Sequence, residues 1–329
     1  MSPKSLPKLE LLQALRALAA LSVVFFHTYY KPGFGAFGVS VFFVISGYIM
    51  AMLLQVETST SRFMLRRIIR VAPLYWVTTT FISILLWWRT GGAIPATKDY
   101  IMSLCFIPFQ QPNGQIQPVL GPGWTLNYEM AFYLSCAVGL MLSVRYSAIA
   151  SVGIVSVWLL LAQLSATTLG IFFGSPVVIL FLLGVAIFEI TKRFKWRSNS
   201  FVGLGLLFIL CLGMAWAEKS MDSNAVSLLG QLLAALTVAC AVFFEPALSR
   251  LSPHLSRRCV EIGEASYAIY LTHLFVIYLF AGIAKKLDYT NSSLALALLT
   301  VVAATAVGIL VHKAIDLPIQ NWLKKLTQQ

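Results

Sequence analysis

Long apolar stretches follow one another along almost the whole of this 329-residue chain. A helix needs about 20 mostly apolar residues to cross the hydrocarbon core of a bilayer, and about ten stretches meet that length. No stretch shows the ten-residue polar and apolar alternation of a membrane β-barrel. We therefore predict an all-α, polytopic membrane protein with about ten transmembrane helices, over residues 11–30, 37–55, 69–88, 124–144, 147–165, 170–190, 201–217, 225–244, 265–284 and 293–311.

The composition agrees with a membrane protein. Hydrophobic residues make up 59% of the chain and charged residues 11%. About a quarter of the residues of an average soluble protein are charged. A soluble globular protein is therefore excluded.

The charges are unevenly divided, with 24 Lys and Arg against 12 Asp and Glu. Such a surplus can suit nucleic acid or anionic lipid, but here the basic residues gather in alternate connections between the apolar stretches. Since basic loops stay in the cytoplasm, this predicts that both termini are cytoplasmic. A nucleic-acid partner therefore loses its support. The residues predicted to be cytoplasmic are Lys4, Lys8, Arg62, Arg66, Arg67, Arg70, Arg145, Lys192, Arg193, Lys195, Arg197, Arg250, Arg257, Arg258, Lys313, Lys324 and Lys325.

The connections leave little room for a second domain. The longest one, residues 89–123, is rich in Gly, Pro and Gln. Residues 100–109 within it are apolar, but the stretch is too short to cross the membrane and can lie at the interface or re-enter. The five cysteines are scattered, which indicates packing residues and no disulfide framework. We expect one membrane domain over residues 1–329, with no appended soluble domain.

Two ionisable residues, Arg16 and His27, share the first predicted span. Eleven residues make about three helical turns, so both project from one face, about 16 Å apart along the axis. Arg16 would lie toward the cytoplasm and His27 near the outer surface. Each also has a simpler interpretation, because Arg16 can extend to the inner interface and His27 can be an interfacial histidine bonded to backbone.

Two more ionisable residues, Glu129 and His273, lie inside predicted spans. Glu129 is expected about 7 Å below the outer boundary, near the depth of His27, where a carboxylate can orient an imidazole. It can equally be an acid favoured by the start of a helix. His273 is expected near mid-membrane, where a histidine needs a partner, and Tyr267 and Tyr270 precede it at three-residue steps.

An arginine cluster, Arg62, Arg66, Arg67 and Arg70, ends the second cytoplasmic connection. Guanidinium groups hold phosphates through paired hydrogen bonds, so the cluster suits a polyanionic ligand. The competing interpretation is a group of charges resting on anionic lipid. By contrast, Asp316 and the run at residues 192–197 are interpreted as ordinary solvated or lipid-facing charges.

A hydrolytic metal site is not expected. No pair of His residues, or of His and Glu, stands at the i, i+4 spacing that such a site uses on a helix. We predict no metal and no bound cofactor.

Five motifs occur in a characteristic order: "LRALAALSVVFFH", "FGAFGVSVFFVISGYIM", "RRIIRVAPLYW", "GPGWTLNYEMAFYL" and "GEASYAIYLTH". Together they resemble the membrane acyltransferase 3 family, over the chain from Gln13 to about Pro318. The first two are most similar to the branch that acetylates exopolysaccharides, related to the succinoglycan acetyltransferases.

The resemblance implies an O-acetyltransferase that uses cytoplasmic acetyl-CoA, or another acyl-CoA, as donor substrate. The acceptor would be a hydroxyl of an extracytoplasmic or lipid-linked glycan, and the enzyme would be a multi-pass protein of the bacterial inner membrane, surrounded by lipid. Some relatives append an SGNH hydrolase-like domain, which this chain is expected to lack. The family's requirement for Arg and His carries over to Arg16 and His27, and its Arg-x-x-Arg to Arg67 and Arg70.

The residues and the family chemistry together predict one site. His27, Arg16 and Glu129 are expected to be catalytic, and Arg66, Arg67 and Arg70 to bind acyl-CoA. His27 can be the general base or an acyl-accepting nucleophile. A transporter or flippase of a glycan or lipid intermediate is the alternative from another class, and a non-catalytic partner of a polysaccharide synthase is a third. The residues expected to line the cavity are Tyr75, Trp124, Tyr270 and His273.

Overall fold

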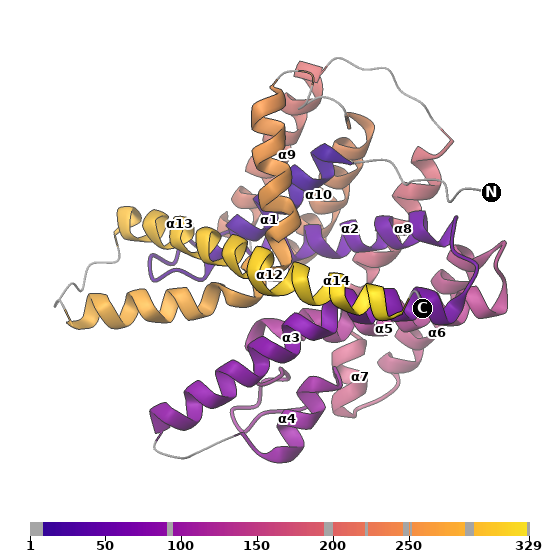
Figure 1. Ribbon diagram of the computed structural model, residues 1–329. Helices are drawn as coiled ribbons and strands as arrows, with labels where there is room; N and C mark the ends of the chain where they lie inside the picture. Colours follow the sequence, from indigo (N-terminus) through magenta and orange to yellow (C-terminus); the bar gives the residue numbers. More distant parts are fainter. Residues whose placement is uncertain are drawn as a thin grey trace. The chain divides into compact units, whose positions relative to one another are not determined.

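The computed structural model describes residues 9–90, 95–193, 200–220, 223–245, 250, 252–286 and 293–327 (Figure 1). All regular elements among these residues are helical, apart from one isolated bridge between Gln110 and Ile116. The predicted all-α class is confirmed. Lys4, Lys8, Lys195 and Arg197, part of the predicted charge pattern, lie outside the described residues.

The chain forms two compact units, each built from two separate stretches of sequence. Unit 1 comprises Met1–Ile49 and Leu180–His312, and unit 2 comprises Met50–Ile179 and Lys313–Gln329. The helices that belong mainly to unit 1 are α1 (Glu10–Phe26), α2 (Phe37–Leu54), α8 (Ile179–Thr191), α9 (Ser200–Ser220), α10 (Ser223–Phe243), α12 (Pro253–Lys286) and α13 (Leu294–Val311). Those of unit 2 are α3 (Thr60–Thr90), α4 (Thr97–Leu104), η1 (Gly121–Gly123), α5 (Trp124–Leu142), α6 (Ser147–Gln163), α7 (Thr168–Phe173), η2 (Pro176–Val178) and α14 (Leu317–Leu326), which follows the π-helical turn η3 (His312–Asp316).

Five helical stretches among the described residues are long and apolar enough to cross a membrane. Three further apolar helices are shorter. The predicted count of about ten spans and the cytoplasmic location of both termini therefore stay predictions. The five long stretches are Phe37–Leu54, Thr60–Trp88, Phe201–Ser220, Pro253–Ala284 and Leu294–Leu326.

The sixth predicted span, residues 170–190, is not one helix, so that prediction was wrong. Helix α7 ends at Phe173, and a 3-10 turn precedes α8. Pro176 has no amide hydrogen and disfavours helical backbone in the residue before it, which breaks the helix here. The Ser175 side chain accepts a hydrogen bond from the Val177 amide and starts the next element.

The core of unit 1 lies where α1, α12 and α13 pack together. Its fully buried side chains include Ala20, Ala265 and Ala304, whose small size lets the helices approach closely. Glu245, just after α10, holds the start of α1 by accepting hydrogen bonds from the amides of Leu11 (2.9 Å) and Leu12 (3.4 Å). Burial raises the pKa of Glu245 to about 7. This core fixes the helix that carries Arg16 and ends at His27.

In unit 2, helix α5 runs antiparallel to α3 but starts only halfway along it. Gly123 lies against the ring of Tyr75, where an added Cβ would come within 2.6 Å of a ring carbon. Ten residues further along α5, Tyr133 lies beneath the guanidinium of Arg67 on α3. The contact with Tyr75 therefore sets the level of α5 against α3, and it leaves the second half of α3 for other segments to cover.

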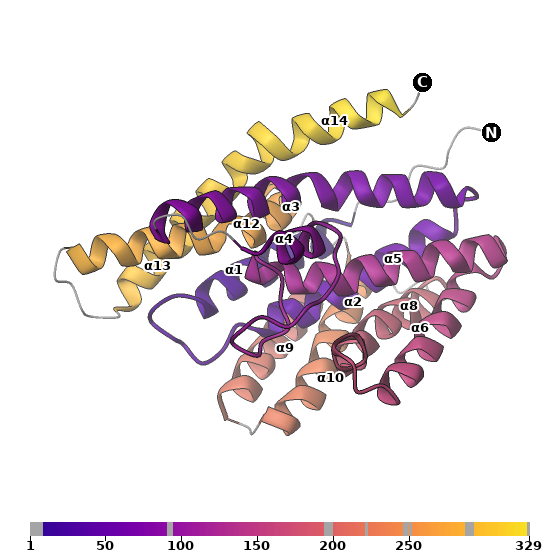
Figure 2. The same ribbon diagram turned by 90° about the horizontal axis from the view of Figure 1, so that it is seen from below.

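Helix α4 and the loop after it cover that second half of α3. Trp76 donates a hydrogen bond to the carbonyl of Leu104 (2.9 Å), and the hydroxyls of Thr80 and Tyr100 are 2.8 Å apart. Phe106 stacks on Tyr75, with ring centroids 5.0 Å apart. Residues 100–109 thus form the end of α4 and the loop after it, both packed against α3 (Figure 2), and their predicted place at the interface or re-entry into the membrane stays a prediction.

Candidate functional site

Two histidines from distant parts of the sequence meet in unit 1. His27 caps the C-terminal end of α1, and His273 lies on α12. Their ring centroids are 5.1 Å apart, with the planes tilted by 59°. His27 is exposed, whereas His273 is fully buried. The sequence proposed both residues for the site but did not predict that they touch.

Hydrogen bonds to backbone carbonyls fix the tautomer of both rings. The Nδ1 atom of His27 is 2.8 Å from the carbonyl of Val23, and Nδ1 of His273 is 2.6 Å from the carbonyl of Tyr270. A carbonyl oxygen only accepts, so each Nδ1 carries the proton when the ring is neutral. Nε2 of each neutral ring then holds a lone pair, and among the described residues Nε2 of His273 has no hydrogen-bond partner.

Arg16 and Tyr270 lie on the same helices as the two histidines. Arg16 is half-buried on α1, with Nη1 3.4 Å from the Gln13 side-chain oxygen. Tyr270 is buried, and its ring contacts Phe42 and His273 at 6.2 and 5.9 Å. Because α1 continues helically into His27, Arg16 and His27 lie on one helix with the predicted spacing.

A second group in unit 2 joins Arg67 to Glu129 through a tyrosine that the sequence argument did not single out. The Tyr133 hydroxyl donates a hydrogen bond to Glu129 Oε1. The Arg67 guanidinium lies 6.0 Å from the centroid of the Tyr133 ring and interacts electrostatically with Glu129. Tyr133 stands one helical turn after Glu129, so the i, i+4 spacing was the available signal.

This group corrects the predicted depths. The sequence placed Arg67 in a cytoplasmic loop and Glu129 near the outer boundary, on opposite sides of the membrane. The two are instead neighbours, because α5 starts halfway along α3 and passes Arg67 one turn after Glu129. The proposed pairing of Glu129 with His27 stays a prediction.

The arginine cluster lines a cavity of about 600 Å³ in unit 2. One wall comes from α3 and the other from α14, and Figure 2 shows the two helices side by side. A volume of this size is in the range of small-molecule sites. The residues lining it are Arg62, Leu65, Arg66, Arg67, Ile69, Arg70, Gln320, Lys324 and Thr327.

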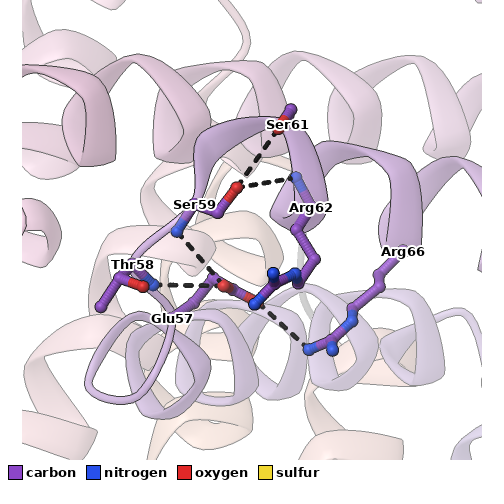
Figure 3. Close-up of polar contacts among 6 residues, drawn as sticks. All are labelled: Glu57, Thr58, Ser59, Ser61, Arg62 and Arg66. Atoms are coloured by element: carbon purple, nitrogen blue, oxygen red, sulfur yellow. Dashed lines mark hydrogen bonds and ion pairs between the residues drawn. The ribbon is translucent and has the colours of Figure 1, made fainter. Parts of the chain in front are cut away.

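An acid next to the cavity holds Arg66 in place. Glu57 is buried, and its Oε2 atom lies 3.1 Å from Nη1 of Arg66. The other oxygen, Oε1, accepts hydrogen bonds from the amides of Thr58 (3.1 Å) and Ser59 (3.3 Å) at the start of α3 (Figure 3). The carboxylate therefore orients Arg66 while most of that side chain stays exposed.

Asp316 holds Arg70 in the same way, which corrects its interpretation as an ordinary solvated charge. It is only 2% exposed, and its Oδ2 lies 3.6 Å from Nη1 of Arg70. Gln320 donates a hydrogen bond to Oδ1 (2.7 Å). A carboxylate this deeply buried needs such partners. Lys192, by contrast, is exposed, pairs with Glu189 one turn away and lies over the ring of Phe188, as an ordinary surface charge on a helix does.

Tyr75 and Trp124, predicted to line a cavity, are not among the residues around the cavity in unit 2. Tyr75 is fully buried between Phe106 and Gly123. Trp124 starts α5 and packs edge-on against Tyr128, with centroids 5.9 Å apart. The cavity-lining roles of these two residues, and of Tyr270 and His273, stay predictions.

No group of three or more His, Cys, Asp or Glu side chains in the described parts of the chain is arranged to hold a metal ion.

The apolar helices and the cavity in unit 2 define a helical membrane protein with a cavity lined by basic side chains. Residues 10–313 match the model of an acyltransferase domain, so the chain belongs to the acyltransferase 3 family. It is therefore an acyltransferase, and the transporter alternative without covalent chemistry is set aside. The five ordered motifs identified this family correctly.

Three relatives show the range of the family. The chain is 30% identical to the exopolysaccharide production protein ExoZ of Rhizobium meliloti (strain 1021), over 89% of this chain and 93% of that protein. It is 24% identical to the acyltransferase MdmB of Streptomyces mycarofaciens, over 98% and 94%. It is 26% identical to the peptidoglycan O-acetyltransferase OatA of Listeria monocytogenes, over 97% of this chain but 56% of that protein. No solved structure gives a significant match.

Proposed function

We propose that this protein is a membrane-embedded O-acetyltransferase that moves an acetyl group from acetyl-CoA to a hydroxyl of a glycan. The observation that carries the proposal is the cavity in unit 2, which is lined by five basic side chains and by no acidic side chain of the described residues. CoA carries a pyrophosphate and a 3′-phosphate, the groups that guanidinium forks bind best. Two relatives, whose names include exopolysaccharide production and peptidoglycan O-acetylation, support a glycan as acceptor.

In the proposed reaction His27 activates the acceptor. Nε2 removes the proton from the sugar hydroxyl, the oxygen forms a bond to the thioester carbonyl carbon, and the carbon–sulfur bond breaks. The CoA thiolate leaves and takes up the proton. Alternatively, Nε2 attacks the thioester first, and the acyl-imidazole passes the acyl group to the hydroxyl. The Nδ1 contact with the Val23 carbonyl leaves Nε2 available for either role.

Arg16 and Glu129 complete the proposed set of catalytic residues, and Arg66, Arg67 and Arg70 bind the donor. The enzyme would act as one domain over residues 1–329, crossing the cell membrane about ten times with both termini in the cytoplasm. Donor phosphates would then be bound on the side where acyl-CoA is made, and the glycan would be acetylated on the extracytoplasmic side or on a lipid carrier.

The function can be tested with membranes that contain the protein, acetyl-CoA labelled in the acetyl group, and a lipid-linked or polymeric glycan. We expect label to appear in alkali-labile ester linkage on the glycan, and free CoA to be released in equal amount. Membranes without the protein give the background. Labelled acetyl-CoA that is left intact with every glycan offered would contradict the proposal.

The arginine cluster gives a more specific prediction. Replacing both Arg66 and Arg70 with glutamine should raise the KM for acetyl-CoA by about 10²- to 10⁴-fold, since the two lost charge-assisted hydrogen bonds cost about 1.5 to 3 kcal/mol each. The KM is measured from initial rates in membranes matched for protein amount. Arg145→Gln is the control, because Arg145 is exposed and does not line the cavity. An unchanged KM in the double variant would return the cluster to the lipid-contacting interpretation.

A further inference from the structure

Helix α14 carries a polar stripe on one face. The stripe has four residues at intervals of four, four and three, so they lie on one side of the helix. They are Asp316 just before the helix, Gln320 and Lys324 within it, and Thr327 just after it. Asp316 and Gln320 are buried at one end, and Lys324 and Thr327 are exposed at the other. The family match ends at residue 313, so it covers none of these four residues.

A matching stripe runs along α3. Arg62, Arg66 and Arg70 follow at intervals of four residues and therefore share a face. Arg70 pairs with Asp316 at one end of the shared cavity, and Arg62 and Lys324 both line it further along. The two helices are thus antiparallel, and their polar faces enclose the cavity from opposite sides.

The charges around this cavity do not balance. Arg62, Arg66, Arg67, Arg70 and Lys324 line it, and none of the Asp and Glu residues that the structure describes does. Glu57 and Asp316 lie at its edge, each already bonded to one arginine and to further donors. Like charges gathered in one cavity repel one another, so a bound polyanion would relieve the repulsion.

We propose that α14 is the second wall of the acyl-donor site and that Lys324 binds a phosphate of CoA, opposite the arginines of α3. This inference rests on the proposed function, because it takes acyl-CoA as the donor. Lys324 is suited to the role, since a flexible ammonium group can follow a phosphate that the fixed arginines hold. Asp316 and Gln320 contribute indirectly by fixing Arg70 and the base of α14.

Direct binding of CoA tests the inference. The full-length protein is placed in nanodiscs of phosphatidylcholine, which has no net charge, and the Kd for CoA is measured by isothermal titration. Lys324→Gln should raise the Kd by about tenfold, the effect of losing one charge-assisted hydrogen bond. Lys325→Gln is the matched control, because the neighbouring lysine is also exposed but does not line the cavity. Its Kd should stay within about twofold of the native value.

Each other outcome has a defined meaning. If native protein binds CoA and the two lysine variants bind it equally well, the role of Lys324 is wrong and the proposed function stands. If native protein does not bind CoA, the acyl-CoA donor is wrong, and this inference fails with it. A phospholipid phosphate is the other chemical match, so the native protein and both variants are also compared in nanodiscs with phosphatidylglycerol. Loss of anionic lipid binding in Lys324→Gln, with unchanged CoA binding, would make the cavity a lipid site and overturn the inference.

Discussion

Alanine in place of His27 is expected to lower the rate of acetyl transfer by about 10²- to 10⁴-fold, the usual contribution of a positioned acid–base group. The side chain is exposed at the end of α1, so its removal should leave the fold intact. Transfer is measured as label moved from acetyl-CoA to glycan in membranes matched for protein amount. His254→Ala is the control, because His254 is an exposed histidine on the same helix as His273 but is not proposed for the site.

Equal transfer by native protein and His27→Ala would remove His27 from the catalytic role. If transfer falls as expected, a second measurement separates the two mechanisms. Native protein is incubated with labelled acetyl-CoA in the absence of glycan and rapidly denatured. Label attached to the protein, and absent from His27→Ala, identifies an acyl-imidazole nucleophile. Unlabelled protein identifies the general base.

Leucine in place of Glu129 is expected to destabilise unit 2 by about 1 to 3 kcal/mol, because it removes the charge next to half-buried Arg67 and the acceptor of the Tyr133 hydroxyl. Arg67 would keep its charge beside Tyr133, and the Tyr133 hydroxyl would lose its acceptor. The measurement is the midpoint of thermal unfolding in detergent. Glu129→Gln is the matched variant, since it keeps an acceptor for Tyr133 and loses only the charge.

A second substitution makes the Glu129 prediction specific to its neighbour. Arg67→Met removes the half-buried cation, so the double variant with Glu129→Leu should unfold at a higher temperature than the sum of the single effects predicts. Strictly additive shifts would show that the two side chains do not interact. Acetyl transfer by Glu129→Gln then reports whether the carboxylate charge is needed for catalysis as well as for stability.

Hydropathy could predict where helices occur along the chain, but not how far neighbouring helices are shifted along their axes relative to one another. The windows at residues 69–88 and 124–144 correctly contain parts of α3 and α5. Their relative level depends on the contact of Gly123 with Tyr75, which no local pattern records. As a result, Arg67 and Glu129 were assigned to opposite sides although they are neighbours. Pro176 marks the helix break in the sequence. Residues 170–190 were nevertheless predicted as one span, because apolar residues continue on both sides of the proline.

The candidate site was predictable where its residues are neighbours along one helix and unpredictable where distant segments meet. Arg16 and His27, or Arg66 and Arg70, follow from helical spacing alone. The contact of His27 with His273 joins the end of α1 to α12, about 250 residues later in the chain. Asp316 was misjudged for the same reason, because its partner Arg70 lies near the other end of the sequence.

The discontinuity of unit 2 also determines when it can be completed during synthesis. Residues 50–179 are made early, whereas α14 is made only after the whole second stretch of unit 1. At about 5 to 20 residues per second, Arg70 is in the chain for at least ten seconds before Asp316 exists. Through that interval the α3 arginines lack one of their acidic partners and the cavity lacks a wall. The newly made enzyme therefore cannot form this cavity until α14 has been added.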